Sequence, residues 1–194
     1  VTPSQLDNMA KRHPSLRLCM SPEYLIDANP IEAFIEEPMI VVGSNREEDA
    51  QSVLDLFKEY SICKATQFFK CDLISAGILK YMENCFLALK VTFMNQMHSI
   101  HQLSGSTDSW DDLVEIFHGG PRMGNSHGKV PGPDGDYGWG GKCFVKDVNA
   151  MTNYTCDELG YDFDLMKKAW EINMRIRTNK DWLKIPGATI NKID

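Results

Sequence analysis

The sequence predicts the tail of a parallel α/β sheet, followed by a mostly α-helical domain built on one long helix. Two observations predict this fold class. Residues 1–60 alternate between strand-like and helix-like segments, the order that is typical of a parallel sheet. From residue 72 to residue 103, apolar residues recur at steps of three and four without a break, which is the spacing of a single helix.

Two strands are predicted in the first part of the chain. LRLCM, residues 16–20, ends at Ser21-Pro22, and MIVVG, residues 39–43, is rich in β-branched residues and ends at a glycine. The segment ICKATQFF, residues 62–69, is expected to be a connector to the long helix.

Two helices accompany these strands. One begins after Thr2, which can cap it together with the following proline and serine. The second covers residues 47–60, where Ser44 is expected to be the cap and Glu47, three residues later, to complete a capping box.

The second part of the chain is predicted to be helical around one long loop. The long helix ends at Ser104-Gly105, and a short helix follows over 109–118. Residues 119–142 are too rich in glycine and proline for regular structure, and loops of this length are usually functional. Two more helices are expected, over about residues 144–159 and 163–179.

Composition excludes several classes of function. The net charge of −7 argues against a nucleic-acid or anionic-membrane surface. The six cysteines form no CxxC pair, so we expect no metal site and no disulfide framework, and a cytoplasmic location fits best. No secretion signal and no long apolar run is present in this sequence.

Cys143 is the strongest candidate for chemistry. It lies in GWGGKCFVKD, residues 138–147, where glycines precede it and a helix begins at it. The positive end of a helix favours a thiolate, and Lys142 and Lys146 add positive charge. Asp147 lies one turn further on the same face, where it can orient a water or a proton. A buried, inert cysteine is the commoner fate of a lone thiol, but this setting favours a nucleophile.

A second set of polar residues lies on the long helix. Lys80 and Asn84 are one turn apart, and Asn95 returns to the same side three turns later. Such residues on an otherwise apolar helix need partners or a polar cavity. The alternative is that these residues form a solvent-exposed stripe. For the three residues together, a functional polar group and a solvent-exposed stripe are equally favoured. Cys85 is expected to lie in the core.

Further candidates lie in two loops. Glu23 and Asp27 follow the first predicted strand, and ligands bind at the carboxyl ends of strands in parallel sheets. The two acidic residues are expected to be a base and a group that orients the ligand, or alternatively only a cap. Arg122 enters the glycine-rich loop and can bind phosphate through two hydrogen bonds, with Lys129 as a weaker candidate for the same role.

Taken together, these segments resemble the UDP-glucose/GDP-mannose dehydrogenase family. The resemblance rests on motifs in a fixed order: SPEYLIDANP, AGILKYMENCFLALKVTFMNQ, PRMGNSH, VPGPDG and GWGGKCFVKDVNAM. It implies that residues 1–66 are the C-terminal part of a Rossmann-like NAD-binding domain. It further implies that residues 67–194 are the central helical domain for substrate binding and dimerisation. The NAD fingerprint GxGxxG and the C-terminal UDP-binding domain of the family are not found in this sequence.

The resemblance also implies a reaction. Such enzymes oxidise the C6 alcohol of UDP-glucose, or of a related sugar nucleotide, to the acid with two NAD, through a thiohemiacetal and a thioester on the residue that matches Cys143. The other matching positions are implied to be catalytic (Lys80, Asn84, Asp147, Glu23), substrate-binding (Tyr24, Leu25, Arg122, Lys129, Gly140) and cofactor-binding (Asp27, Lys146). Arg122 is implied to reach the substrate of the neighbouring subunit in a homodimer formed through the long helix, residues 72–103.

Three positions depart from the family pattern, because Asp27, Gln96 and Val145 stand where the family usually has Glu, Glu and Pro. Asp27 is one methylene group shorter than the usual Glu. We expect the chain alone to have little or no activity. The alternatives are a non-catalytic helical dimerisation remnant and a β-hydroxyacid dehydrogenase-like protein, although the latter needs no cysteine.

Overall fold

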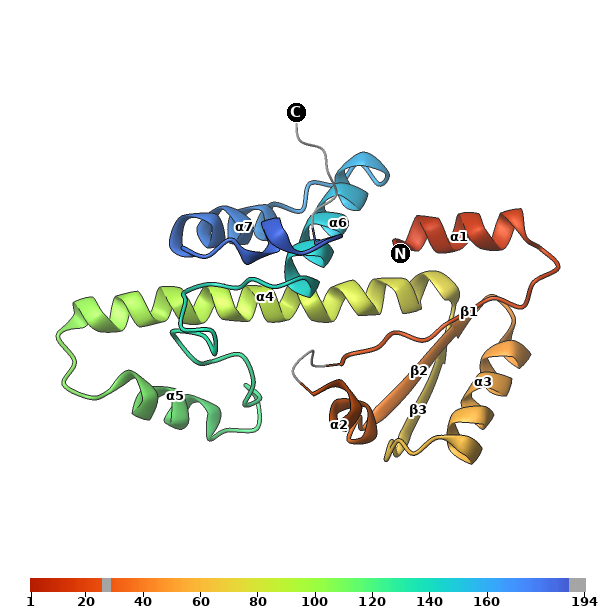
Figure 1. The fold of residues 1–194 in the computed structure, drawn as a ribbon, viewed down its shortest axis with the longest axis horizontal. Coiled ribbons are helices and arrows are strands. Elements are labelled where there is room, and N and C mark those ends of the chain that lie inside the picture. Colours follow the sequence, from red (N-terminus) through yellow and green to blue (C-terminus); the bar gives the residue numbers. More distant parts are fainter. Residues whose placement is uncertain (26–28, 189–194) are drawn as a thin grey trace. The chain divides into compact units, whose positions relative to one another are not determined.

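A computed structural model describes residues 1–25 and 29–188. The chain forms two compact units, Val1–Met82 and Glu83–Asp194, and the division falls within the long helix α4. Figure 1 shows the elements in order along the chain. Their bounds are α1 (Pro3–Arg12), β1 (Cys19–Met20), α2 (Pro30–Ile35), β2 (Met39–Ser44), α3 (Glu47–Tyr60), β3 (Gln67–Cys71), α4 (Leu73–Ser104), α5 (Trp110–His118), α6 (Cys143–Asp157), α7 (Asp164–Ile176) and the 3-10 helix η1 (Asp181–Lys184).

The first unit is built on a three-stranded sheet in the order β1-β2-β3. β2 pairs in parallel with β3, with Val41 opposite Phe69, and antiparallel with the short β1. α3 packs on this sheet, and its core consists of side chains from β2 and α3: Ile40, Val42, Ala50 and Leu54. The expected sheet with a parallel pair, followed by a mainly helical body with one long helix, is confirmed.

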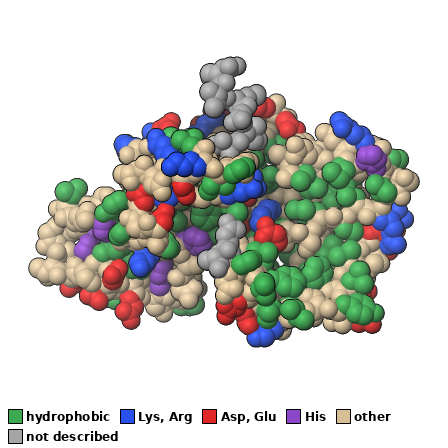
Figure 2. Space-filling view, viewed as in Figure 1, with side chains coloured by type: hydrophobic (Ala, Val, Ile, Leu, Met, Phe, Trp, Pro, Cys, Tyr) green, Lys and Arg blue, Asp and Glu red, His purple; other side chains and the backbone are tan. Residues whose placement is uncertain are grey.

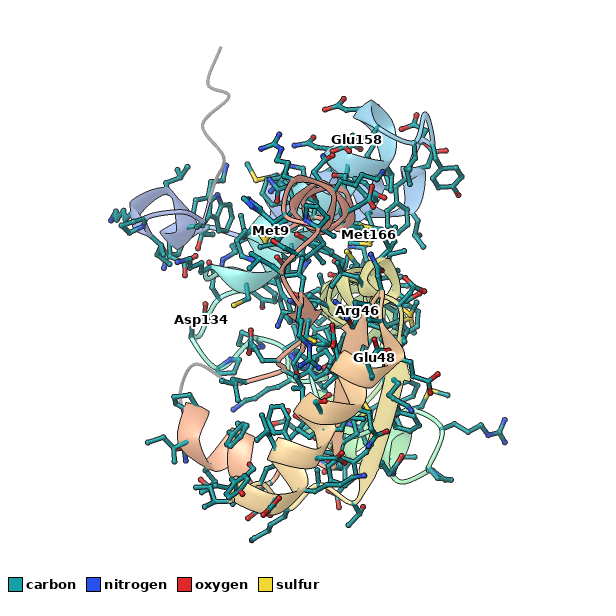
Figure 3. The ribbon with its side chains drawn as sticks, turned by 90° about the vertical axis from the view of Figure 1, so that its right-hand side faces the viewer. Met9, Arg46, Glu48, Asp134, Glu158 and Met166 are labelled. Atoms are coloured by element: carbon teal, nitrogen blue, oxygen red, sulfur yellow. The ribbon has the colours of Figure 1, made fainter. Side chains whose placement is uncertain are left out.

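Two local predictions in this unit are wrong. The expected connector contains β3, because Gln67–Cys71 pairs residue by residue with β2. Ser44 does not cap α3, because β2 extends through it and its hydroxyl donates to the Leu18 carbonyl at 2.9 Å. The N-cap of α3 is Arg46, which makes no side-chain cap bond. Arg46 contacts Glu48 at 3.3 Å instead, and the two lie side by side in Figure 3.

The capping prediction for α1 is confirmed. The Thr2 hydroxyl accepts a hydrogen bond from the Gln5 amide at 3.3 Å, and the Gln5 side chain accepts one from the Thr2 amide at 2.9 Å. This reciprocal pair satisfies two amide groups that a helix start leaves unpaired.

The start of α4 is fixed against the sheet. The Asp72 carboxylate accepts hydrogen bonds from the Ser75 amide at 2.8 Å and from its hydroxyl at 2.6 Å, and these bonds lower the pKa of Asp72. Gly43, in β2, allows close packing here, because a Cβ atom would lie 2.4 Å from the Ala76 Cβ and 2.7 Å from the Asp72 carbonyl oxygen. These contacts set the position of Lys80, two turns further along α4.

The second unit contains the rest of α4 together with α5, α6, α7 and η1. Its core joins side chains from four of these helices and from the glycine-rich segment: Cys85, Ala88, Trp139, Val145, Val148, Met166, Ala169 and Trp182, with Ala188 beyond η1. The predicted helices are present with ends shifted by a few residues, and residues 119–142 form neither helix nor strand, as expected.

Exposed apolar side chains are numerous in the first unit. Figure 2 shows hydrophobic side chains gathered over its sheet and α2, and the exposed ones include Ile31, Tyr60, Ile62 and Phe69. Surfaces of this kind are typical of contacts with other polypeptide. In the described part of the chain, no helix is both long enough and apolar enough to span a membrane.

Candidate active site

Cys143 is the first residue of α6, as the sequence predicts. Its side chain is half-buried and forms no disulfide. Lys142 precedes it as the N-cap and makes no side-chain cap bond, so the first amides of α6 receive no bond from the capping side chain. The thiol therefore lies at the positive end of a 15-residue helix.

The segment before Cys143 is held through its main chain. The Gly138 amide donates to Asn95 Oδ1 at 3.0 Å, and the Gly141 amide donates to the Asp181 carboxylate at 3.1 Å. Between them, Asn173 accepts from the Trp139 amide at 2.8 Å and donates to the Trp139 carbonyl at 2.9 Å. Gly138 and Gly141 both have a φ of +70°, a conformation that glycine adopts without strain.

Gly140 lies against the guanidinium group of Arg177. A Cβ atom at this position would be 2.3 Å from Arg177 Nη2, so only glycine fits. Arg177 is buried and donates to Asp134 Oδ2 at 2.6 Å, to the Asn179 carbonyl at 2.8 Å and to Asp181 at 3.4 Å. Asp134 lies in the glycine-rich segment (Figure 3). This network gives Gly140 a structural role that sequence reasoning did not foresee.

Asp147 is the centre of a polar group in the second unit. Its carboxylate accepts a hydrogen bond from the side-chain amide of Asn84 and forms an ion pair with Lys146 Nζ, and the distance between the nitrogen and the oxygen is 2.5 Å in each contact. Asn84 and Asp147 are both buried, whereas Lys146 is half-buried. Cys85 lies nearby in the core, where burial and the negative charge of Asp147 raise its pKa from 9.0 to about 12. This thiol is therefore neutral at physiological pH, in agreement with its expected place in the core.

Lys80 belongs to a separate polar group in the first unit. Its ammonium group donates to the Glu23 carbonyl, and to the Glu23 carboxylate at 2.9 Å. It also lies 5.5 Å from the centre of the Tyr24 ring. The sequence analysis placed Lys80 in one motif and Glu23 and Tyr24 in another, and the fold brings the two motifs together. Asn84 follows Lys80 by one turn of α4.

The glycine-rich loop exposes its two basic candidates. Arg122 and Lys129 are both solvent-exposed. The loop is attached to α4 by Lys90, whose ammonium group donates to the carbonyls of Met123 at 2.8 Å and Gly124 at 3.2 Å. Leu25 is exposed as well, and Asp27 lies outside the described residues.

Sequence reasoning missed the residues that hold the Cys143 segment. Asn173, Arg177 and Asp181 follow one another at intervals of four residues in α7 and just after it. A signal was available, because Asn173 occupies a buried, otherwise apolar face of the predicted helix, where an amide needs a partner.

Comparison with known proteins identifies the family. Residues 74–175 match the UDP-glucose/GDP-mannose dehydrogenase family, central domain. The chain belongs to this family.

Relatives of known activity are similar over most of this chain. It is 28% identical to the UDP-glucose 6-dehydrogenase YwqF of Bacillus subtilis over 162 residues, which is 82% of this chain and 33% of that protein. It is 30% identical to the UDP-glucose 6-dehydrogenase of Rickettsia typhi over 179 residues, or 92% of this chain and 37% of that protein. The chain therefore spans about a third of the length of these dehydrogenases.

Solved structures share the fold. A UDP-glucose dehydrogenase from Pyrobaculum islandicum superposes with a TM-score of 0.77 at 24% identity, covering 90% of this chain and 39% of that one. A UDP-D-ManNAc dehydrogenase from Pyrococcus horikoshii gives a TM-score of 0.71 at 22% identity, covering 91% and 40%. The family match begins at residue 74, so it includes Lys80, Asn84, Cys143 and Asp147, whereas Glu23 precedes it.

Proposed function

We propose that this chain is the cysteine-bearing portion of a nucleotide-sugar dehydrogenase that oxidises the C6 alcohol of UDP-glucose, or of a related sugar nucleotide, to the acid. The observation that supports this most is the placement of Cys143 at the start of α6, one turn before a buried carboxylate that Asn84 and Lys146 hold in place. Family membership supports the reaction type.

Cys143 would act on the aldehyde formed from the alcohol. Its thiolate attacks C6, a C–S bond forms, the π bond of the aldehyde breaks, and the oxygen takes up the electron pair and then a proton. The developing negative charge needs donors, and the Lys80 ammonium group and the Asn84 amide are of the right chemistry. Both residues belong to α4, where they are one turn apart in the sequence.

Loss of a hydride from C6 of the thiohemiacetal, which the proposed NAD would accept, would leave a thioester on Cys143. The second part of the reaction would be hydrolysis of this thioester. A water attacks C6, the C–S bond breaks, and the thiolate is restored as the acid leaves. Asp147 would orient that water, since a carboxylate held by two donors keeps a fixed position. Glu23 is the proposed acid/base for this step, and its carboxylate contacts Lys80 Nζ at 2.9 Å.

The remaining residues would bind the substrate. Tyr24, Leu25 and Gly140 are proposed to line the sugar, mainly through their main chains. Arg122 and Lys129 are proposed to contact the phosphates. Both are exposed and carry the positive charge that a diphosphate needs.

NAD would accept the hydrides, and the described residues fit only part of its site. The dinucleotide is normally cradled by a glycine-rich turn between a strand and a helix. Among the described residues, the stretches that join a strand to the following helix contain no glycine, and Gly43 lies inside β2, where it packs against Ala76 and the Asp72 carbonyl oxygen. Lys146, with its half-exposed ammonium group, and Asp27 are the proposed contacts near the nicotinamide.

A homodimer through α4 is part of the proposal. Phe86, Phe93 and Ile100 are exposed and recur every seven residues, so they form one apolar stripe along the second unit's part of this helix. α5 adds the exposed Ile116. A second copy of this chain would cover the stripe, and Arg122 would then reach the substrate of the neighbouring subunit.

Protection from alkylation tests the proposed chemistry without NAD. The chain is incubated with UDP-glucose 6-aldehyde, and the iodoacetamide labelling of each cysteine is measured by mass spectrometry. Cys143 should be labelled faster than the other five without the aldehyde and should be protected with it, while free UDP serves as the control. If the aldehyde leaves Cys143 labelling unchanged, the nucleophile is assigned wrongly.

The same experiment addresses the alternative of a dimerisation remnant, which the apolar stripe on α4 favours. A remnant needs no reactive thiol, so Cys143 would then react no faster than the exposed Cys156.

A further inference from the structure

The segment Gly138–Gly141 has no regular structure, yet its main chain is fixed at three of its four residues. The partners come from α4 (Asn95), from α7 (Asn173) and from η1 (Asp181). The fourth residue, Gly140, is packed against Arg177. One residue, Lys142, separates the segment from Cys143.

Asn173 makes the most specific of these contacts. Its side-chain oxygen accepts a hydrogen bond from the main-chain amide of Trp139, and its side-chain nitrogen donates one to the carbonyl of the same residue. Asn173 is completely buried, so no water replaces these bonds if they are lost. The Trp139 indole is fixed as well, through its bond of 2.9 Å to the Thr92 hydroxyl.

The geometry has a consequence for the thiol. Cys143 begins α6, so the direction in which the chain enters α6 decides where the thiol lies relative to the amides of the helix start. Gly138 and Gly141 adopt a left-handed conformation, and glycines leave the main chain of the segment free to adopt many conformations. The hydrogen bonds from Asn95 and Asn173 select one of these conformations.

We infer that Asn173, assisted by Asn95, is a positioning residue for Cys143, acting through the main chain of Gly138 and Trp139. This inference rests on the proposed role of Cys143 as nucleophile. Neither asparagine needs to touch the substrate. Their effect should appear in the reactivity of the thiol.

The cysteines of the chain provide the test. Iodoacetamide labelling is followed between pH 6 and pH 9 at Cys143, at Cys156 in the last turn of the same helix, and at Cys85 in the core. Cys156 is exposed and gives the rate of an ordinary thiol, and Cys85 is buried and reports unfolding. The variants are Asn173→Leu, which keeps the shape and removes both bonds, and Ala169→Gly, which weakens α7 one turn away.

In Asn173→Leu, the labelling rate of Cys143 relative to Cys156 should fall about threefold to tenfold, the size expected when a thiolate loses its place at a helix start. The pH midpoint of Cys143 labelling should rise, while Cys85 stays protected. Ala169→Gly should leave the ratio unchanged. The inference is overturned if Asn173→Leu changes neither the ratio of Cys143 to Cys156 labelling rates nor the pH midpoint of Cys143 labelling. It is also overturned if Cys85 becomes labelled as much as Cys143 labelling decreases, because the decrease would then reflect unfolding.

A pair of variants at Asn95 keeps the test decisive if Asn173→Leu does not fold. Asn95→Asp retains an acceptor for the Gly138 amide, and Asn95→Leu removes it. The first should preserve the fast labelling of Cys143 and the second should lose it. Equal rates in the two would overturn the inference. If the unaltered chain already labels Cys143 no faster than Cys156, the proposed function itself fails, which is a distinct result.

Discussion

The side-chain amide of Asn84 donates a hydrogen bond to the carboxylate of Asp147, which lies 63 residues later in the sequence, and both side chains are buried. The second carboxylate oxygen accepts from Lys146. Burying a carboxyl group without partners is costly, so these two donors offset the cost of placing Asp147 beside the apolar core.

Removing the carboxylate should destabilise the second unit. In Asp147→Ala the buried Asn84 amide loses its acceptor, and we expect the free energy of unfolding to fall by about 1–3 kcal/mol. Urea denaturation measures this. Asp162→Ala is the control, because it breaks an exposed ion pair with Lys167 and should leave the free energy of unfolding almost unchanged. Equal losses in the two variants would argue that Asp147 has no special structural role.

The raised pKa of Cys85 predicts a loss of stability in alkali. The folded chain keeps this thiol protonated up to about pH 12, whereas the unfolded chain releases the proton near pH 9.0. The contribution is therefore fully present below pH 9 and is lost as the pH rises through this window, by at most about 1.4 kcal/mol per pH unit. Urea midpoints from pH 8 to pH 10.5 should fall less steeply in Cys85→Ala. Cys156 is exposed, so the urea midpoints of Cys156→Ala should change with pH as those of the unaltered chain do. The prediction is contradicted if the midpoints of Cys85→Ala fall as steeply with pH as those of the unaltered chain.

Gly140→Ala should disturb the approach to Cys143. The added Cβ would lie 2.3 Å from Arg177 Nη2, and Arg177 is held by Asp134 and by the Asn179 carbonyl, so it has little freedom to move. We expect a loss of about 1–3 kcal/mol in unfolding free energy together with slower Cys143 alkylation. Gly120→Ala, where the new methyl group meets open space, should change neither quantity. Unchanged alkylation in Gly140→Ala would show that the segment tolerates displacement.

Charges on the α4 stripe should separate a dimer. Phe86→Glu combined with Phe93→Glu places two carboxylates in the proposed interface, and burying them there is unfavourable. Sedimentation equilibrium should show the dimer dissociation constant rising by more than about tenfold. The exposed Leu183→Glu, in η1, is the matched control and should leave association intact. A dimer of unchanged strength in the double variant would place the interface elsewhere.

Turnover by the chain alone is expected to be small or absent. The described residues offer no glycine-rich dinucleotide cradle, because none of those that join a strand to the following helix is a glycine. With UDP-glucose and NAD, the absorbance of NADH should not rise above that of the Cys143→Ser variant. Robust, cysteine-dependent production of NADH would contradict this prediction.

The elements that the sequence predicted well are those with long, regular patterns. α4 and α3 were found almost to the residue, because their apolar spacing runs over many turns. β3 was missed, because QFFKC is short, mixes polar and aromatic residues and lies on an exposed edge. Its strand identity comes from pairing with β2, which no local pattern shows.

For the candidate site, as for the fold, the sequence predicted relations within one helix but not contacts between distant segments. Cys143 and Asp147 lie on one helix, so their spacing alone could relate them, and the same holds for Lys80 and Asn84. Contacts between segments far apart in the sequence were beyond such reasoning. The pairing of Asn173 with Trp139 joins residues 34 positions apart, and it depends on the packing of α7, which periodicity does not specify.

The segment before Cys143 is held through its main chain, and the side chains that hold it exclude larger residues at two positions. A Cβ atom on Gly138 would lie 2.2 Å from Asn173 Oδ1, and one on Gly140 would lie 2.3 Å from Arg177 Nη2. Lys142, the last residue before the thiol, is exposed and makes no side-chain cap bond to α6. The approach to Cys143 therefore combines two positions closed to side chains with one neighbouring position, Lys142, that is expected to accept many residues without disturbing these contacts.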